Sequence, residues 1–326
     1  MTDPNKGAKI TLYWYIPSSH TLPPIPSTPT LTIKLKYHKY RLSQSRSHRI
    51  LWLLEALHLT YDLKIYHRGP DKLAPAELKE IHPLGKSPLL TIQPANAPPD
   101  QKPIVLAESG IIIEYLLDHF GDNAAAAEKP LLPARWKPNQ EGVVGGETEE
   151  WMRYRYFMHY AEGSLMPFLV MQLVMDSKSY LPLFPMRYGT CPTDKEGRMF
   201  MLMMVVMVTA VKNPPGMPFF VKPLPRLVAG QVEKAFLARN IQSHLEFLED
   251  QLRSSPNGGA YLCGTELTAA DIMMSFPVIA MSGRLADQLD KFPLLGKYAE
   301  RLQKEEGYIR AVKKVEEVEG KFEASL

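Results

Sequence analysis

Residues 42–57, LSQSRSHRILWLLEAL, constrain the fold of this chain of 326 residues more than any other stretch. Hydroxyl and basic residues come directly before apolar residues at helical spacing, which predicts a helix that buries one broad face. Ser45 or Ser47 can cap the start of this helix. A helix N-terminus also offers unsatisfied N–H groups and the positive end of the dipole, so it stabilises an anion such as a thiolate. Serines that only cap the helix are the alternative interpretation.

Short strands are expected on both sides of this helix. Residues 9–14 and 61–66 combine β-branched and aromatic residues with alternating hydrophobicity. Residues 89–93 and 104–107 are expected to be short strands on either side of a turn that contains Pro, Ala and Asn. Residues 31–37, LTIKLKY, are a second candidate for the first strand. Helices are expected at 75–81 and 109–120. The order β-α-β followed by β-β-α predicts an α/β thioredoxin-like N-terminal domain at residues 1–125.

Helical patterns replace strand patterns in the second half of the chain. After a linker at 126–145, residues 146–326 are expected to form an all-α C-terminal helical domain. Thr148 opens a helix with one apolar stripe. A capping box follows later, with Thr268 at the N-cap and Asp271 three residues on. Further helices are expected at 232–252, 294–304 and 307–318.

Two stretches interrupt these patterns. Residues 15–41 are rich in Pro, Ser and Thr, so no helix can cross them. Residues 178–210 contain Cys191 and a Met-rich run, and they fit no neighbouring periodicity. Both stretches are predicted to be insertions, with translated intervening sequence as one origin. For the second stretch, a genuine loop or helix is the alternative.

Composition excludes several classes of function. A formal charge of +3 without a dense Lys/Arg run does not suit nucleic-acid binding. Two cysteines offer neither a disulfide framework nor a metal-ligand cluster, which fits a reducing compartment. The N-terminus lacks the features of a signal peptide. The most hydrophobic window, residues 199–211, falls short of the roughly 20 apolar residues of a membrane span. No metal, nucleic acid or transmembrane segment is expected.

Two motifs follow the serine-rich stretch in order. The first is HPLGKSPLL at residues 82–90, and the second is LAESGII at residues 106–112. Together with the residues before the first helix, 43–47 (the serine loop), they resemble the N-terminal domain of glutathione transferases, specifically fungal members with a serine-type active site. The resemblance covers residues 42–120 and 145–320, apart from the second suspected insertion, and it implies the two-domain glutathione transferase architecture.

The resemblance assigns the central catalytic role to Ser45. Its hydroxyl would donate a hydrogen bond to the glutathione sulfur, because hydrogen bonding to a thiolate favours the charged form. Arg46 could add positive potential, whereas Arg49 is expected to be structural. The suspected insertion blurs the alignment just upstream, so several residues compete with Ser45 for this role: Ser43, Ser47, Tyr37 and Tyr40.

The same resemblance assigns glutathione binding to the two motifs. Ser87 and Pro88 would form a cis bond whose backbone pairs with the cysteinyl part of glutathione like an added strand. The family usually has a β-branched residue where this chain has Ser87. Glu108 would bind the γ-glutamyl ammonium, Ser109 its carboxylate, and Lys86 the glycyl carboxylate. Read singly, these residues indicate only a capped helix and a solvated lysine.

The implied activity is glutathione S-transferase activity, with glutathione as the co-substrate, a hydrophobic electrophile as the second substrate, and no metal. A non-catalytic glutathione-binding or regulatory module of the same fold is one alternative, and a glutathione-dependent peroxidase or reductase is another. Thiol transfer through a mixed disulfide lacks its nucleophile, because no cysteine lies near the serine loop. The resemblance also implies a homodimer in the cytoplasm, with peripheral association with the endoplasmic reticulum as a further option.

The electrophile's site is poorly specified by the sequence. In the architecture that the chain resembles, the helical domain lines this site, and it supplies several apolar residues: Trp151, Tyr154, Tyr156, Met158, Met166 and Phe168. Core packing is the alternative role for these side chains. Cys263 is expected to be a small buried residue. The histidines at 48, 58 and 67 lack ligand spacing, so surface or packing roles are expected.

Overall fold

The computed structural model describes residues 3–16, 41–42, 45–67, 77–98, 100–126, 130–176, 236–284, 290–319 and 323–324. Residues 31–37, the alternative first strand, lie outside the described residues, as do residues 178–210. Three of the competitors for the catalytic role are also outside them: Ser43, Tyr37 and Tyr40.

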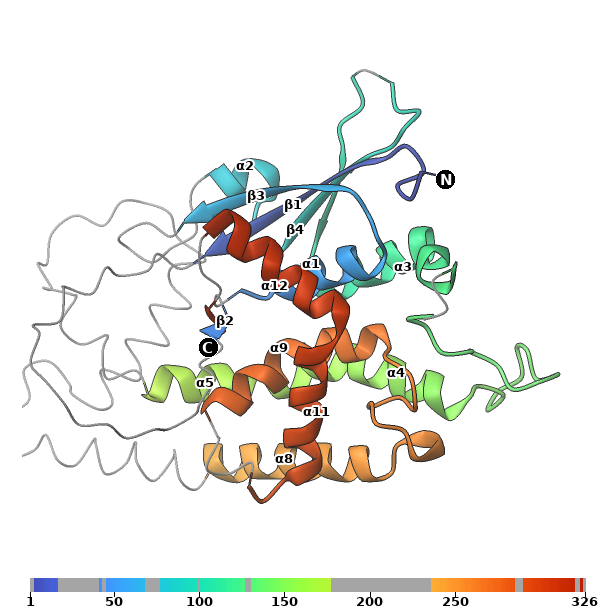
Figure 1. Ribbon diagram of the computed structural model, residues 1–326, viewed down its shortest axis with the longest axis vertical. Coiled ribbons are helices and arrows are strands. Elements are labelled where there is room, and N and C mark those ends of the chain that lie inside the picture. Colours follow the sequence, from blue (N-terminus) through green and yellow to red (C-terminus); the bar gives the residue numbers. More distant parts are fainter. Residues whose placement is uncertain are drawn as a thin grey trace, which may run out of the picture. The chain divides into compact units, whose positions relative to one another are not determined.

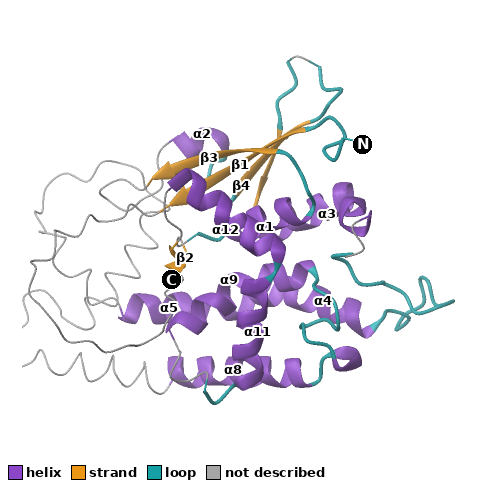
Figure 2. Cartoon of the chain, in the orientation of Figure 1, coloured by secondary structure: helices purple, strands orange, loops and turns teal. Residues whose placement is uncertain are grey.

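Four strands form one mixed sheet (Figure 2). They are β1 (Lys9–Ile16), β3 (Tyr61–His67), β4 (Leu89–Gln93) and β5 (Ile104–Ala107). The order across the sheet is β3-β1-β4-β5, with β1 parallel to β3 and antiparallel to β4. This confirms the thioredoxin-like prediction, and the first strand is the one near the N-terminus. Its last two residues, Tyr15 and Ile16, belong to the stretch that was expected to be inserted.

Helices cover both faces of this sheet. The first three are α1 (Ser47–Ala56), α2 (Glu77–Ile81) and α3 (Ser109–Ala126). Tyr13 of β1 packs with Leu78 of α2, whereas Trp14 meets the ring of His48 in α1, with centroids 6.3 Å apart. Because successive side chains of a strand point to opposite faces, α1 and α2 lie on opposite sides of the sheet (Figure 1).

Helix α1 is buried between the sheet and later helices. It contacts α3, α9 (Ala269–Arg284) and α12 (Glu306–Glu319). Figure 1 shows α12 crossing α1, with which it is in contact. At this contact, Gly307 lies so close to Trp52 that an added Cβ would be 2.6 Å from the indole nitrogen. Nearby, Arg310 donates a hydrogen bond of 3.1 Å to the carbonyl oxygen of Glu55.

The predicted capping box begins α9. The Asp271 carboxylate accepts hydrogen bonds from the Thr268 backbone N–H (2.8 Å) and hydroxyl (2.7 Å). It also accepts from the Leu262 N–H (3.1 Å) and the Tyr298 hydroxyl (2.7 Å). Tyr298 belongs to α11 (Pro293–Lys304). One buried carboxylate therefore connects the start of α9, the preceding loop and α11.

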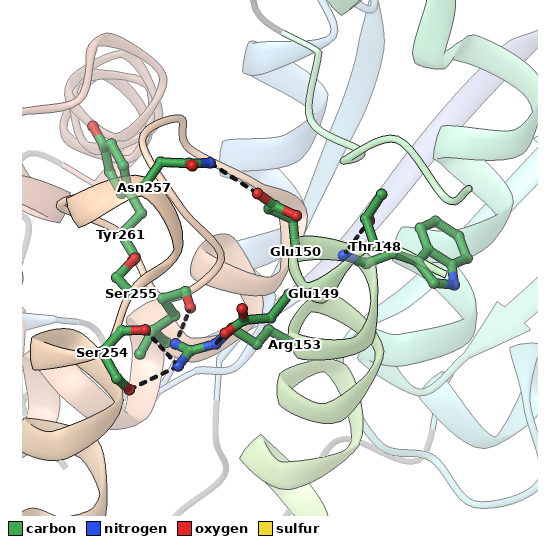
Figure 3. A network of polar contacts seen from close by, with 10 residues as sticks. Thr148, Glu149, Glu150, Arg153, Ser254, Ser255, Asn257 and Tyr261 are labelled. Atoms are coloured by element: carbon green, nitrogen blue, oxygen red, sulfur yellow. Dashed lines mark hydrogen bonds and ion pairs between the residues drawn. The ribbon is translucent and has the colours of Figure 1, made fainter. Parts of the chain in front are cut away.

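A second polar network surrounds the start of α4 (Glu149–Tyr160). Thr148 caps this helix by accepting a hydrogen bond from the Trp151 N–H (3.1 Å). Arg153 donates to the Ser254 carbonyl and hydroxyl oxygens, each at 2.8 Å, and to the Leu262 carbonyl oxygen at 3.0 Å (Figure 3). These bonds join α4 to the loop that precedes α9.

The chain forms two compact units, Met1–Met158 with Leu252–Leu326, and His159–Gln251. The second unit contains a π-helical turn (Ala161–Leu165), α5 (Met166–Asp176) and most of α8 (Ala238–Arg253). Within it, the Tyr160 hydroxyl lies 2.7 Å from His244 Nδ1. The division into domains at residues 1–125, a linker at 126–145 and 146–326 stays a prediction from the sequence.

Two further strands of two residues each lie outside the main sheet. Strand β2 (Arg41–Leu42) pairs in parallel with β6 (Glu323–Ala324). The residues near the C-terminus therefore lie beside the segment that leads into the serine loop. In the part of the chain that the structure describes, no helix has the length and apolar character needed to span a membrane.

Candidate functional site

The serine loop ends at the first residue of α1. Ser45 is 5% exposed, and its Oγ accepts a hydrogen bond of 3.2 Å from the Ser47 N–H, one of the orphan donors of the helix start. Arg46 holds the N-cap position without a side-chain capping bond. Neither serine therefore holds the N-cap position, which corrects the sequence prediction, but the Ser45 hydroxyl group still accepts a hydrogen bond from the helix start.

Three hydroxyl groups are linked at this point. Ser45 Oγ lies 3.0 Å from Ser47 Oγ, and Ser47 Oγ lies 2.6 Å from Ser87 Oγ. Ser87 also donates to the carbonyl oxygen of Tyr13 at 3.2 Å. The chain of hydroxyl groups thus runs from the serine loop to the loop before β4 and ends on β1.

The loop before β4 contains three of the predicted glutathione-binding residues, Lys86, Ser87 and Pro88. The bond between Ser87 and Pro88 is cis, as predicted. Lys86 is exposed and Pro88 is buried. Gly85 has φ +55°, a left-handed conformation that favours glycine, and its N–H donates to the His82 carbonyl oxygen at 2.8 Å.

The start of α3 lies at the same end of the sheet as this loop. Leu89 pairs with Ala107 across the antiparallel strands β4 and β5. Pro88, which directly precedes Leu89, and Glu108, which directly follows Ala107, therefore lie at the same end of the sheet. Glu108 has φ +73°, which is uncommon for a residue with a side chain and costs of order 1–3 kcal/mol where the surroundings enforce it. Its side chain is exposed, and the neighbouring Ser109 is buried.

Positive charge surrounds the start of α1. Arg49 is fully buried, and its Nη1 donates to Met273 Sδ at 2.9 Å while the guanidinium lies 5.5 Å from the Phe276 ring centroid. The first turn of α1 contains no acidic residue. Burial, with the Arg49 charge as the second cause, lowers the pKa of His48 to about 3, so this ring is neutral at physiological pH. The arrangement favours an anion near Ser45.

The structure brings most of the predicted site residues to one region. Ser45 is linked to Ser87 through the Ser47 hydroxyl group, and Pro88 follows Ser87 in the chain. The strand register places Glu108 and Ser109 at the same end of the sheet as Pro88. Sequence reasoning considered Ser47 as a helix cap and as a competitor of Ser45, and missed its link to Ser87 and, through Ser87, to the Tyr13 carbonyl group. The nearest signal was a serine two residues after Ser45 together with a serine before the cis proline.

The aromatic and methionine residues proposed for an electrophile site divide into two groups. Three are core residues, with 1–4% exposure: Tyr154, Met158 and Met166. Tyr156 is 49% exposed, and Trp151 and Phe168 are half-buried, with Trp151 beside the Tyr154 ring. The alternative of core packing therefore applies to the first group.

No other described group provides an obvious reactive centre. Burial raises the pKa of the Cys263 thiol, so this residue is a small buried side chain, as expected, and not a nucleophile. His48 is a packing residue that meets the Tyr308 ring with centroids 4.7 Å apart. Among the described ranges, no cluster of His, Cys, Asp and Glu side chains could hold a metal ion.

Two family models match the chain. One, described as "Glutathione S-transferase, N-terminal domain", matches residues 45–119. The other, described as "Glutathione S-transferase, C-terminal domain", matches residues 220–309. Together they cover just over half of the chain, and the first contains every predicted glutathione-binding residue.

Similar proteins agree with these matches. Glutathione S-transferase 1 of Saccharomyces cerevisiae is 29% identical over 281 residues, which cover 86% of this chain and 96% of that protein. Glutathione S-transferase 3 of Schizosaccharomyces pombe is 27% identical over 241 residues, 74% of this chain and 72% of that protein. A solved glutathione transferase from Phanerochaete chrysosporium, in complex with oxidized glutathione, has a TM-score of 0.53 at 15% identity, covering 96% and 98%. This last likeness concerns the fold alone.

Proposed function

The chain belongs to the glutathione S-transferase family, and from this premise we propose that it conjugates glutathione to hydrophobic electrophiles. The observation that carries the proposal is the gathering of the Ser45 hydroxyl, the Ser87–Pro88 loop and the start of α3 around one end of the sheet. A thiolate bound there would attack an electrophilic carbon. A C–S bond forms, and the leaving group departs with its electron pair.

Glutathione would bind along three backbone segments. Glu108 binds its α-ammonium group, and the hydroxyl and N–H groups at the start of α3, beginning with Ser109, bind the γ-glutamyl carboxylate. The backbone of Ser87 pairs with the cysteinyl residue. Lys86, which is exposed beside this loop, binds the glycyl carboxylate. The exposed carboxylate of Glu108 at φ +73° supports its role, since strained backbone concentrates at ligand sites.

Ser45 would stabilise the thiolate that glutathione forms when its thiol proton leaves to solvent. An isolated thiol has a pKa of about 8.5, and each unit of lowering corresponds to about 1.4 kcal/mol of preference for the anion. The O–H of Ser45, the N-terminus of α1 and the positive charge of Arg46 and Arg49 all act in this direction. No acidic residue in the first turn of α1 opposes them.

A homodimer is part of this proposal. Exposed apolar side chains lie on β5, α3 and α4, at Val105, Ile111, Met152 and Tyr156. A second copy could cover this surface. The cytoplasmic location and an association with the endoplasmic reticulum rest on the family resemblance.

The test uses the full chain, with glutathione binding measured by calorimetry and conjugation measured with chlorodinitrobenzene. We expect saturable binding and turnover, and at least a tenfold loss of affinity in Ser109→Ala or Glu108→Ala. Ser243→Ala is the matched control, because its exposed hydroxyl donates only to the carbonyl of Arg239 within α8. Binding without turnover would favour the regulatory module, and turnover of cumene hydroperoxide alone would favour the peroxidase. Absence of binding would overturn the proposal.

A further inference from the structure

We propose that Ser47 and Ser87 are positioning residues that direct the Ser45 hydroxyl toward the glutathione sulfur through a chain of three hydroxyl groups. The inference rests on the proposed function, because it needs a thiolate beside Ser45. The Ser47 side chain contacts Ser45 directly, and the Ser87 side chain contacts it through the Ser47 hydroxyl group. Neither side chain needs to touch the substrate.

The distances define one continuous chain. The Oγ atoms of Ser45 and Ser47 are 3.0 Å apart, those of Ser47 and Ser87 are 2.6 Å apart, and Ser87 Oγ lies 3.2 Å from the Tyr13 carbonyl oxygen. Ser45 and Ser47 are 5% and 0% exposed, so water does not compete freely for these bonds. Each hydroxyl group has one proton to donate, and therefore the orientation of one fixes the orientation of the next.

In the structure, the two ends of the chain have a fixed direction. Ser45 donates to Ser47, Ser87 donates to the Tyr13 carbonyl oxygen, and either of Ser47 and Ser87 can donate to the other. This first direction directs the Ser45 proton away from a bound sulfur. The proposal therefore requires a bound thiolate to reverse it. In the second direction, Ser87 donates to Ser47, Ser47 donates to Ser45, and Ser45 donates to the thiolate, and no proton changes its oxygen.

The second direction makes Ser45 a stronger donor. Its oxygen then accepts both the Ser47 hydroxyl and the Ser47 N–H, the latter at 3.2 Å, while its own proton faces the sulfur. Consecutive hydrogen bonds polarise one another, which strengthens the last bond of the chain. Since Ser87 belongs to the loop proposed to bind the cysteinyl backbone, the chain also couples ligand binding to the orientation of Ser45.

Other charges act on the same thiol, and they must be separated from the hydroxyl groups. The charged or titratable side chains on the surrounding segments are Arg46, His48 and Arg49 on α1 and its loop, Lys86 and Glu108, Lys64 over the Tyr13 ring, and Tyr308 of α12 against His48. The α9 side chains that contact Arg46 and Arg49 are Met273 and Phe276, and both are uncharged. Serine substitutions leave all of these groups in place.

The experiment measures the pKa of the thiol of bound glutathione, by following the ultraviolet absorbance of the thiolate against pH in the full chain. Ser87→Val and Ser87→Thr have the same shape, so their difference reports the hydroxyl group alone. We expect Ser87→Val to raise the thiol pKa by about 0.5–1 unit, a threefold to tenfold loss of thiolate at a fixed pH. Glutathione bound to Ser87→Thr should have the same thiol pKa as glutathione bound to the wild-type chain. In parallel, kcat should fall in Ser87→Val while KM for glutathione changes little.

Further variants distinguish the two levels of the proposal. Ser87→Ala adds no volume, and the thiol pKa of glutathione bound to it should equal that for Ser87→Val. Ser47→Ala should raise this thiol pKa at least as much. If Ser45→Ala leaves the thiol pKa unchanged, the proposed role of Ser45 fails. If Ser45→Ala raises the pKa but the Ser47 and Ser87 variants do not, the proposed chain is wrong while the transferase proposal stands. Equal values for Ser87→Val and Ser87→Thr would also overturn the chain.

Discussion

Two helices in the same compact unit begin with serine or threonine, and they satisfy their N-termini in different ways. At the start of α9, the Asp271 carboxylate supplies the anion and accepts four hydrogen bonds. At the start of α1, three hydroxyl groups are linked to one another, and no carboxylate occupies the first turn. The start of α9 is complete without a ligand, whereas the start of α1 can still stabilise an anion.

This difference separates stability from function. A buried carboxylate that receives several hydrogen bonds holds elements together, and its removal leaves donors without acceptors. Burial raises the pKa of the Asp271 carboxyl, while the hydrogen bonds from Tyr298, Thr268 and Leu262 lower it. The start of α1 instead combines hydroxyl groups, a helix N-terminus and the buried Arg49, which together suit a ligand's negative charge.

The largest effect on stability is expected from Asp271→Ala. Four donors lose their acceptor in a site that is fully buried, so the free energy of unfolding should fall by about 3–5 kcal/mol. Denaturant unfolding followed by tryptophan fluorescence measures this loss. The thiol pKa of glutathione bound to the remaining folded protein should not change. Asp271→Asn, which keeps one acceptor oxygen, should lose less, and an equal loss would contradict this account.

A smaller effect is expected from Gly307→Ala, which disturbs the support of α1 without altering its hydroxyl groups. The new Cβ would lie 2.6–2.7 Å from two atoms of the fully buried Trp52 ring, so overpacking should cost about 1–3 kcal/mol. The matched control is Gly296→Ala in α11, where a Cβ meets nothing within 4 Å. That variant should be stabilised by up to about 1 kcal/mol. Similar unfolding midpoints for both variants would show that α12 does not hold α1 tightly.

The smallest effect on stability is expected at the start of α3. Glu108→Gly relieves the left-handed conformation at φ +73°, so it should be more stable than Glu108→Ala by about 1 kcal/mol. Both variants lose the carboxylate, and we expect the same loss of glutathione affinity by calorimetry. Equal stability of the two variants would show that the backbone at residue 108 is not strained.

Local patterns explain why most of the fold could be predicted. Alternation in residues 61–66 and the Thr268–Asp271 spacing are properties of short segments, and both the strand and the capping box are present. The choice between two candidate first strands required knowledge of strand pairing, which periodicity does not contain. Helix α3 was expected to end at Phe120, but it continues through Gly121 to Ala126, because the cost of one glycine, about 1 kcal/mol, is offset by the alanines that follow.

The candidate site was predictable only where a motif contains its own chemistry. The cis bond before Pro88 follows from its motif and is present. The contact between Ser47 and Ser87 joins residues forty positions apart, and it depends on how α1 packs against the sheet. The conformation of Glu108 depends on the junction between β5 and α3, which no spacing of residue types reveals.

The most direct test of the central claim is the thiol pKa of glutathione bound to Ser45→Ala, compared with the wild-type chain. We predict a rise of at least about one unit, equivalent to about 1.4 kcal/mol of lost preference for the thiolate. The rate of conjugation should fall by about a hundredfold, as when one donor to a developing anion is removed. The free energy of unfolding should fall by only about 1 kcal/mol, because the Ser47 N–H loses its acceptor. An unchanged thiol pKa would contradict the account, and would leave the start of α1 as only a capped helix.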